Sequence, residues 1–332
     1  MPRFAANLSM LFTEMDFLDR FAAAAEAGFS GVEYLFPYDY PAEEIKARLD
    51  AHNLTQVLFN LPAGDWANGD RGIACDPERV EEFHAGVDQA IAYAKVLGNT
   101  QINCLAGIAP KGADLGKLEM TFIENLRYAA KKLEAEGIRL VMEMINTRDI
   151  PRFFLNNSSQ ALEIRDKVGS TNLFLQYDIY HMQIMEGDLA RTLETNLAAI
   201  NHVQLADNPG RNEPGTGEIN YRFLFEHLDL IGYQGWVGYE YKPLRLDLSV
   251  PASWVCPWLR TFRKLATAFL FRLTTMRPRP PCSKQAPLVW PIRKKSRRKP
   301  SSSSSWCRTP RMSKTCCSAR TVLPKASART SW

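Results

Sequence analysis

Residues 173–206 contain the unit that decides the fold, and they read LFLQYDIYHMQIMEGDLARTLETNLAAINHVQLA. The stretch begins with the apolar run Leu173–Asp178 and ends with a second apolar run, His202–Ala206. Between the two runs lies Asp188–Leu197, which has the composition and spacing of a helix. A strand, a helix and a second strand in this order predict two parallel strands joined by a crossover.

The same alternation extends through the chain on both sides of this stretch. Further strands are expected at Phe4–Leu8, Gly31–Tyr34, Gln56–Asn60, Thr100–Leu105, Arg139–Glu143 and Gly235–Glu240, and further helices at Asp16–Ala27, Ala42–His52, Pro77–Leu97, Lys117–Glu136, Ser159–Val168 and Tyr221–Leu230. Eight strands alternating with seven helices predict a closed barrel, since a doubly wound sheet normally has fewer strands. No glycine-rich nucleotide-binding motif follows any of these strands. The expected fold class is therefore an α/β (β/α)8 TIM barrel.

The composition of the chain changes abruptly near residue 243. Residues 1–242 hold 21 Lys and Arg against 35 Asp and Glu, a formal charge of −14, whereas residues 243–332 hold 20 bases and one acid, a charge of +19. Before the break the only cysteines are Cys75 and Cys104, which favours the reducing cytoplasm. The chain has no apolar run of about 18 residues and no signal-peptide pattern at its start, so we expect a cytoplasmic protein without a membrane partner.

Oxygen-bearing side chains recur at the carboxyl ends of the later strands, where a TIM barrel has its active site. Glu143, Asp178 and Glu240 each end an expected strand, and Gln204 lies near the end of another. Buried carboxylates are costly unless they are paired or bind a metal, and oxygen ligands suit hard divalent cations. A solvated loop residue or a helix cap would explain any one of them. Four on consecutive strands at matching depth predict a Mg²⁺ or Mn²⁺ site.

Two further side chains are candidates for substrate binding. His181 follows Asp178 by three residues and is expected to reach a substrate oxygen, with a structural histidine as the alternative. Arg211 lies in the polar loop 207–218, which has the turn chemistry of a binding loop. A guanidinium there could bind a carboxylate through two hydrogen bonds, and a solvated loop arginine is the alternative.

Seven motifs between residues 7 and 243 carry a family resemblance. They are NLSMLF (7–12), FPYDY (36–40), NLPAGDW (60–66), ENLRYAA (124–130), YDIYHMQ (177–183), EPGTGEINY (213–221) and EYKP (240–243). With these motifs the chain resembles the hydroxypyruvate isomerase family of xylose-isomerase-like TIM barrels. The related 2-oxo-tetronate isomerases share Asn7–Met10 and Glu240–Pro243, but Asn60–Trp66 and Tyr177–Gln183 fit the hydroxypyruvate family better. The resemblance stops after Pro243.

The resemblance implies that hydroxypyruvate, a small keto acid, is converted to tartronate semialdehyde. It implies that Glu143 and Glu240 form the proton donor and acceptor pair, and it supports Asp178 and Gln204 as fellow metal ligands. Related sugar epimerases carry a histidine where this chain has Gln204, and a neutral amide should hold a metal more weakly.

The substrate carboxylate needs a cation, and Arg211, Lys242 and Arg71 are the candidates. Lys242 follows Glu240 by two residues and would point to the same side if the strand continued; a surface lysine is the alternative. Glu33 and Trp66 could line the pocket, although an ion pair or core packing would explain them as well.

Other functions remain open from the sequence. Isomerisation or epimerisation of a longer keto acid or a sugar is the alternative within the fold, and a binding protein with a structural Glu pair is another. DNA-repair endonucleases share the barrel, but the charge of −14 on residues 1–242 disfavours a nucleic-acid partner. The oligomeric state, including a homo-oligomer, is also left open.

We expect the chain to divide into an isomerase domain at 1–243, an improvised helix against the barrel within 244–270, and a disordered basic Arg/Pro/Ser-rich tail at 271–332. A basic arm for nucleic acid is one interpretation of the tail. GC-rich coding DNA read in the wrong frame also gives Arg, Pro, Ser and Cys with few acids. Suitable codons for residues 290–317, read two nucleotides later, spell a segment that resembles tartronate semialdehyde reductase. We therefore hypothesise that a frameshift joined two neighbouring genes and that the tail has no evolved function.

Overall fold

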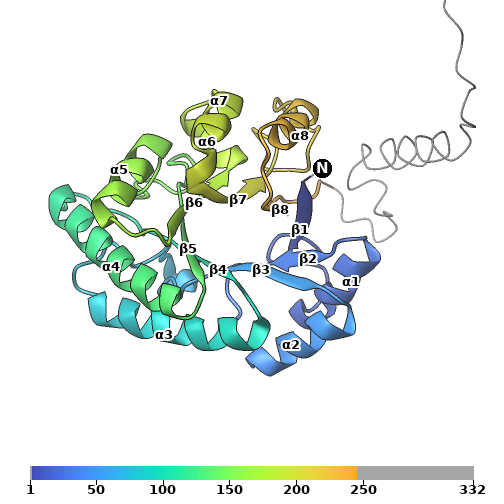
Figure 1. The fold of residues 1–332 in the computed structure, drawn as a ribbon, viewed down its shortest axis with the longest axis horizontal. Coiled ribbons are helices and arrows are strands. Elements are labelled where there is room, and N and C mark those ends of the chain that lie inside the picture. The colour runs from blue at the N-terminus through green and yellow to red at the C-terminus, as the bar shows by residue number, and fades with distance from the viewer. Residues whose placement is uncertain (1, 245–332) are drawn as a thin grey trace, which may run out of the picture. The chain divides into compact units, whose positions relative to one another are not determined.

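The computed structural model describes residues 2–244, which form a closed ring of eight parallel strands surrounded by helices (Figure 1). The strands are β1 (Arg3–Asn7), β2 (Gly31–Glu33), β3 (Thr55–Asn60), β4 (Gln101–Cys104), β5 (Arg139–Glu143), β6 (Leu173–Asp178), β7 (Ile200–Leu205) and β8 (Trp236–Tyr239). Each strand pairs with the next in sequence, and β8 pairs with β1 to close the ring. The predicted (β/α)8 barrel is confirmed.

The α-helices cover the outside of the ring, and three short 3-10 helices lie in its loops (Figure 1). The α-helices are α1 (Arg20–Glu26), α2 (Ala42–Ala51), α3 (Val80–Leu97), α4 (Leu115–Ala135), α5 (Ser158–Val168), α6 (Ile179–Met185), α7 (Leu189–Thr195) and α8 (Tyr221–Leu230). The 3-10 helices are η1 (Phe17–Asp19), η2 (Trp66–Asn68) and η3 (Leu197–Ala199). The sequence did not predict α6, which follows β6 without an intervening loop. The other seven α-helices lie within or close to their predicted ranges.

Helix α3 illustrates how the outer layer is held to the sheet. Phe83, Val87, Ala90 and Ala94 recur every three or four residues and are all buried, so one face of the helix packs into the core. The helix ends at Gly98, whose φ of 70° is the left-handed conformation that glycine adopts without strain.

Polar residues on neighbouring strands lie at matching heights at the carboxyl end of the barrel. Asn7 is opposite Glu33, Asn60 is opposite Asn103, and Asp178 is opposite Gln204. Glu143 is opposite Gln176 on β6. The strand pairing therefore gathers these side chains at one end of the ring, while a small apolar cluster of Ala5, Val57, Leu58 and Val141 lies lower in the barrel.

The predictions for 245–270 and for the tail at 271–332 concern residues that lie outside the described part of the chain. None of the helices within residues 2–244 is both long enough and apolar enough to cross a membrane.

Candidate active site

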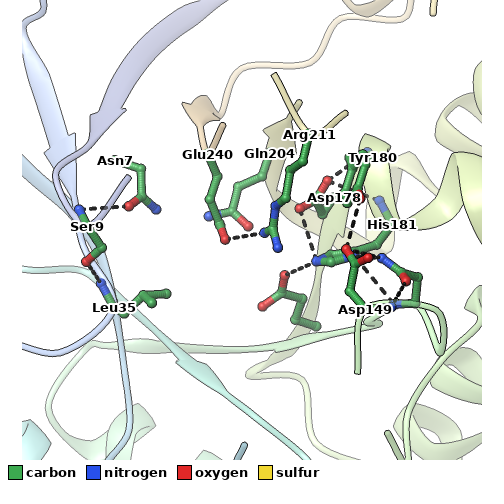
Figure 2. Close-up of polar contacts among 12 residues, drawn as sticks. Asn7, Ser9, Leu35, Asp149, Asp178, Tyr180, His181, Gln204, Arg211 and Glu240 are labelled. Carbon is green, nitrogen blue, oxygen red and sulfur yellow. Dashed lines mark hydrogen bonds and ion pairs between the residues drawn. The ribbon is translucent and has the colours of Figure 1, made fainter. Parts of the chain in front are cut away.

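The side chains predicted from the strand ends come together in the structure. Glu143 ends β5, Asp178 ends β6, Gln204 lies next to the end of β7, and Glu240 follows β8. At most 5% of each residue is exposed. Figure 2 shows Arg211 beside Glu240, with Asp178 and His181 on its other side.

Asp178 has two roles in the local structure because β6 leads directly into α6. Its Oδ1 accepts hydrogen bonds from the backbone N–H groups of Tyr180 (2.7 Å) and His181 (3.4 Å), which caps the helix. Its Oδ2 is buried and has no hydrogen-bond partner among the described residues. This cap turns α6 so that His181 lies beside the carboxylates.

The proton of His181 is positioned by Asn146. The backbone N–H and the side-chain Nδ2 of Asn146 both lie within hydrogen-bond distance of His181 Nδ1, at 3.4 and 2.6 Å. A backbone N–H can only donate, so Nδ1 accepts and the ring proton is on Nε2. Nε2 lies 3.6 Å from Asp178 Oδ2 and 3.8 Å from Glu143 Oε1. The histidine therefore presents a donor between the two carboxylates.

Gln204 is held by side chains on the strands around it. Its Nε2 donates to Glu33 Oε1 at 2.7 Å, and its Oε1 accepts from Gln176 Nε2 at 2.5 Å. Glu33 Oε2 lies 2.8 Å from His202 Nε2, and Asn7 Nδ2 donates to Glu33 Oε1 at 3.1 Å. Glu33 therefore forms a buried interaction with a histidine and fixes the orientation of the Gln204 amide.

Arg211 pairs with Glu240 across the centre of the site. Arg211 Nη2 lies 2.6 Å from Glu240 Oε1, and the guanidinium carbon is 5.3 Å from the centre of the Tyr180 ring. The loop that carries Arg211 is held by Asp207, whose carboxylate accepts hydrogen bonds from the backbone N–H groups of residues 208, 215, 217 and 219. A charged side chain is thus placed in the site by a well-anchored loop.

Burial controls the protonation of the acidic groups. Burial, with the charges of Glu240 and Asp178, raises the pKa of Glu143 well above its ordinary value. Burial likewise raises the pKa of Asp178 to about 6 and the pKa of Glu240 to about 8, although Arg211 partly offsets both. The pKa of His181 is lowered by burial and by Arg211, so its ring is neutral at pH 7.

One possible ligand atom each from Glu143, Asp178 and His181 lies within 4.8 Å of the others, so the two carboxylates could hold a metal ion beside the Nε2–H of His181. The unpartnered Asp178 Oδ2 and the raised pKa values of the carboxyl groups both suit a bound cation. The predicted ligands Gln204 and Glu240 lie beside this group, with their side chains bonded to Glu33, Gln176 and Arg211.

Two of the predicted cations form no ion pair with the site carboxylates among the described residues. Strand β8 ends at Tyr239, so the continued strand that would have aimed Lys242 at the site does not occur, and Lys242 is exposed. Arg71 lies over the Trp66 ring at 4.2 Å and donates to the backbone oxygen of Trp66 at 3.0 Å. Of the three candidates, Arg211 is the one in contact with the carboxylates.

Sequence reasoning did not assign Asn103 and Asn146 to the site. Asn103 Nδ2 donates to Glu143 Oε2 at 3.0 Å and to Asn60 Oδ1 at 3.1 Å. Asn103 lies next to the end of β4, as Gln204 lies next to the end of β7, so its strand position was a signal that could have identified it. Asn146 lies in the loop after β5, where no sequence signal marked it.

The sequence matches a known protein family over most of the barrel. The model of the xylose isomerase-like TIM barrel family matches residues 21–261. This chain belongs to that family. The matched range extends beyond Pro243, the residue after which the family resemblance was expected to stop.

Individual proteins with similar sequences include two kinds of isomerase. The chain is 57% identical to hydroxypyruvate isomerase of Escherichia coli K12 over 258 residues, which are 78% of this chain and 100% of the relative. It is 49% identical to 2-oxo-tetronate isomerase of Cupriavidus necator over 78% of this chain and 99% of the relative. Among solved structures, AP endonuclease, family 2 from Brucella melitensis is 48% identical, with a TM-score of 0.75 over 78% of this chain and 99% of that one.

Proposed function

We propose that this xylose isomerase-like barrel interconverts hydroxypyruvate and tartronate semialdehyde. The observation that carries the proposal is the convergence of Glu143 and Glu240, two buried carboxyl groups with raised pKa values, at the carboxyl end of the barrel. The identity of 57% to a hydroxypyruvate isomerase over that relative's full length supports the choice of substrate. The enzyme is thus an aldose–ketose isomerase.

The reaction moves a proton between neighbouring carbon atoms. A proton leaves C3 of hydroxypyruvate, an enediolate forms, and a proton is added at C2. One glutamate must act as a base and the other as an acid. Carboxyl groups with pKa values raised toward neutrality suit both tasks, because each form is then accessible at the working pH. We assign these two roles to Glu143 and Glu240.

A second proton must move between the substrate oxygens, since the hydroxyl group on C3 becomes a carbonyl and the carbonyl on C2 becomes a hydroxyl. The Nε2–H of His181 is directed between Glu143 and Asp178, so it can donate a hydrogen bond to an oxygen of the enediolate while the proton lost by the C3 hydroxyl group passes to the oxygen on C2. Arg211 would bind the substrate carboxylate, exchanging part of its interaction with Glu240 for the ligand.

A divalent ion, Mg²⁺ or Mn²⁺, would be held by Glu143, Asp178, Gln204 and Glu240, with His181 beside it. When bound, it would supply a Lewis acid that stabilises negative charge on the substrate oxygens. The amide of Gln204 would turn its oxygen to the ion only if the hydrogen bond from Gln176 were shared or released.

The experiment measures conversion of hydroxypyruvate with a coupled reductase, with EDTA and with added Mg²⁺ or Mn²⁺. Glu143→Gln and Glu240→Gln should each lower kcat by about 10³-fold or more, while circular dichroism and Tm stay close to those of the unchanged chain. Glu194→Gln, on the surface of α7, is the matched control and should keep full activity. Full activity in either site variant would refute the assigned roles.

A second candidate is isomerisation of 2-oxo-tetronate, favoured by the relatives of that name at 43–49% identity. Parallel measurement of kcat/KM for both substrates separates the two. A higher kcat/KM for 2-oxo-tetronate would transfer the proposal to that substrate.

A further inference from the structure

A cavity of about 620 Å³ lies at the amino-terminal end of the barrel, at the opposite end of the strands from the candidate active site. Six strands contribute their first residue to its wall, namely Arg3, Thr55, Gln101, Arg139, Ile200 and Trp236. A cavity of this volume lies within the range that small-molecule sites occupy.

The cavity is cationic. Arg3 and Arg139 are the charged residues of its wall, and they belong to β1 and β5, which are opposite one another in the ring of eight strands. Arg3 Nη2 donates to the Gln234 backbone oxygen at 2.7 Å, and Arg139 Nη1 donates to Asn201 Oδ1 at 3.2 Å. Within residues 2–244, neither guanidinium group forms an ion pair with a carboxylate. Both are exposed and lie over aromatic rings, Arg3 over Trp236 at 4.8 Å and Arg139 over Phe174 at 5.9 Å, and both retain N–H donors and a positive charge without a carboxylate partner among the described residues.

The wall also offers neutral polar groups. Gln56 is only 4% exposed, and its Oε1 has no hydrogen-bond partner among the described residues, although its Nε2 donates to the Leu58 backbone oxygen. A buried acceptor without a donor is costly, so a ligand hydroxyl group would stabilise it. Asn201 Nδ2 donates to Gln101 Oε1 at 2.5 Å, and Gln101 Nε2 lies 3.3 Å from His202 Nδ1. These amides make part of the cavity wall polar, and Val57, Ile200 and Trp236 contribute apolar surface beside them.

We propose that this cavity binds a small hydroxylated organic anion, with Arg3 and Arg139 binding its negative charge and Gln56 accepting a hydrogen bond from its hydroxyl group. The chain's own residues 245–332 have a formal charge of +19, so they do not complement two arginines. The negative charge of the ligand could be a carboxylate or a phosphate ester, because a guanidinium binds both.

The test is calorimetric titration of the full chain with glycerate, glycerol 3-phosphate, propionate and glycerol. We expect at least one hydroxylated anion to bind, glycerol not to bind, and propionate to bind more weakly than glycerate. Binding of glycerate assigns a carboxylate ligand, and binding of glycerol 3-phosphate alone assigns a phosphate ester. Arg3→Gln and Arg139→Gln should each weaken binding by about tenfold or more, whereas Arg191→Gln, an exposed arginine of α7, should not.

Three results would overturn the proposal. The first is that neither hydroxylated anion binds the unchanged chain. The second is that binding persists in both cavity variants, as it would if basic residues elsewhere held the anion. The third is that Arg211→Gln abolishes binding while Arg3→Gln and Arg139→Gln leave it intact, which would place the anion at the other end of the barrel. Equal affinity for propionate and glycerate would remove the role of Gln56.

Discussion

Folding raises the pKa values of Glu240 and Asp178, so both carboxyl groups bind a proton more readily in the folded chain than in the unfolded chain. Their pKa values rise from 4.5 to about 8 and from 3.8 to about 6, with burial as the main cause. A raised pKa in the folded state means that the folded chain binds more protons than the unfolded chain. The stability from these groups is therefore complete below their ordinary pKa values and is lost as the pH rises through about 6 and about 8.

We expect the free energy of unfolding of the metal-free protein to fall as the pH rises from about 4 to about 8, between the ordinary and the raised pKa values of these two groups. Urea unfolding in EDTA at several pH values measures this dependence. In Glu240→Gln, which cannot ionise at this position, the decline should be shallower. An equally steep decline in that variant would show that the protonation of Glu240 does not control stability.

A substitution of His181 tests whether its ring proton is on Nε2. Because Asn146 occupies Nδ1, the donor function of the ring depends on Nε2–H. His181→Asn removes that donor from between the carboxylates, and we expect kcat to fall by about 10²-fold or more with a smaller change in KM. His84→Asn is the control, because His84 stacks on Tyr128 at 3.7 Å, away from the site. An unchanged kcat in His181→Asn would contradict the donor role.

At the scale of elements, the loop between β7 and α8 depends on one carboxylate. Asp207 accepts the backbone N–H groups of residues 208, 215, 217 and 219, so Asp207→Ala would leave four donors without their acceptor. We expect faster amide hydrogen exchange over residues 208–219 and a loss of kcat/KM of about tenfold or more, because Arg211 loses its fixed position. Exchange mass spectrometry measures the first effect and steady-state kinetics the second.

The surface variant Glu194→Ala serves as the control for this loop. If exchange in 208–219 were the same in both variants, Asp207 would not be the anchor of the loop.

Helices and strands with strong local signals were predictable. Helix α8 was predicted with its observed bounds, because an apolar stripe begins after Asn220, which caps the helix through its side chain. Helix α6 was not predicted, since it has only seven residues and its N-cap, Asp178, is the last residue of the predicted strand. Short helices capped by a strand-end residue carry little periodicity of their own.

The positions of the acidic side chains of the site were predictable from the sequence. The hydrogen bonds that orient Gln204 and His181 were not. Strand ends identified Glu143, Asp178 and Glu240, because three acids at equal depth demand an explanation. The amide of Gln204 is oriented by Glu33, which lies 171 residues away in sequence. Likewise the tautomer of His181 depends on Asn146, 35 residues before it. Contacts over such distances follow from the closed ring and leave no local pattern.

At the scale of the whole molecule, the described barrel and the segment after it have opposite charge. The family match ends at residue 261, and the barrel strands all lie before residue 240. We therefore expect a chain of residues 1–261 to retain the turnover and Tm of the full chain. Coupled kinetics and thermal unfolding of both chains test this. A large loss of either property in the shorter chain would contradict the hypothesis that the tail has no evolved function.

The pairing of β8 with β1, from Arg3 opposite Trp236 to Ala6 opposite Tyr239, has a consequence for how the protein behaves among other chains. An open sheet ends in two rows of unpaired N–H and C=O groups, which act as templates for edge-to-edge aggregation. The eight described strands leave no such row, because each has a neighbour on both sides. A neighbouring protein chain therefore finds no strand edge among residues 2–244 on which to add itself to the sheet.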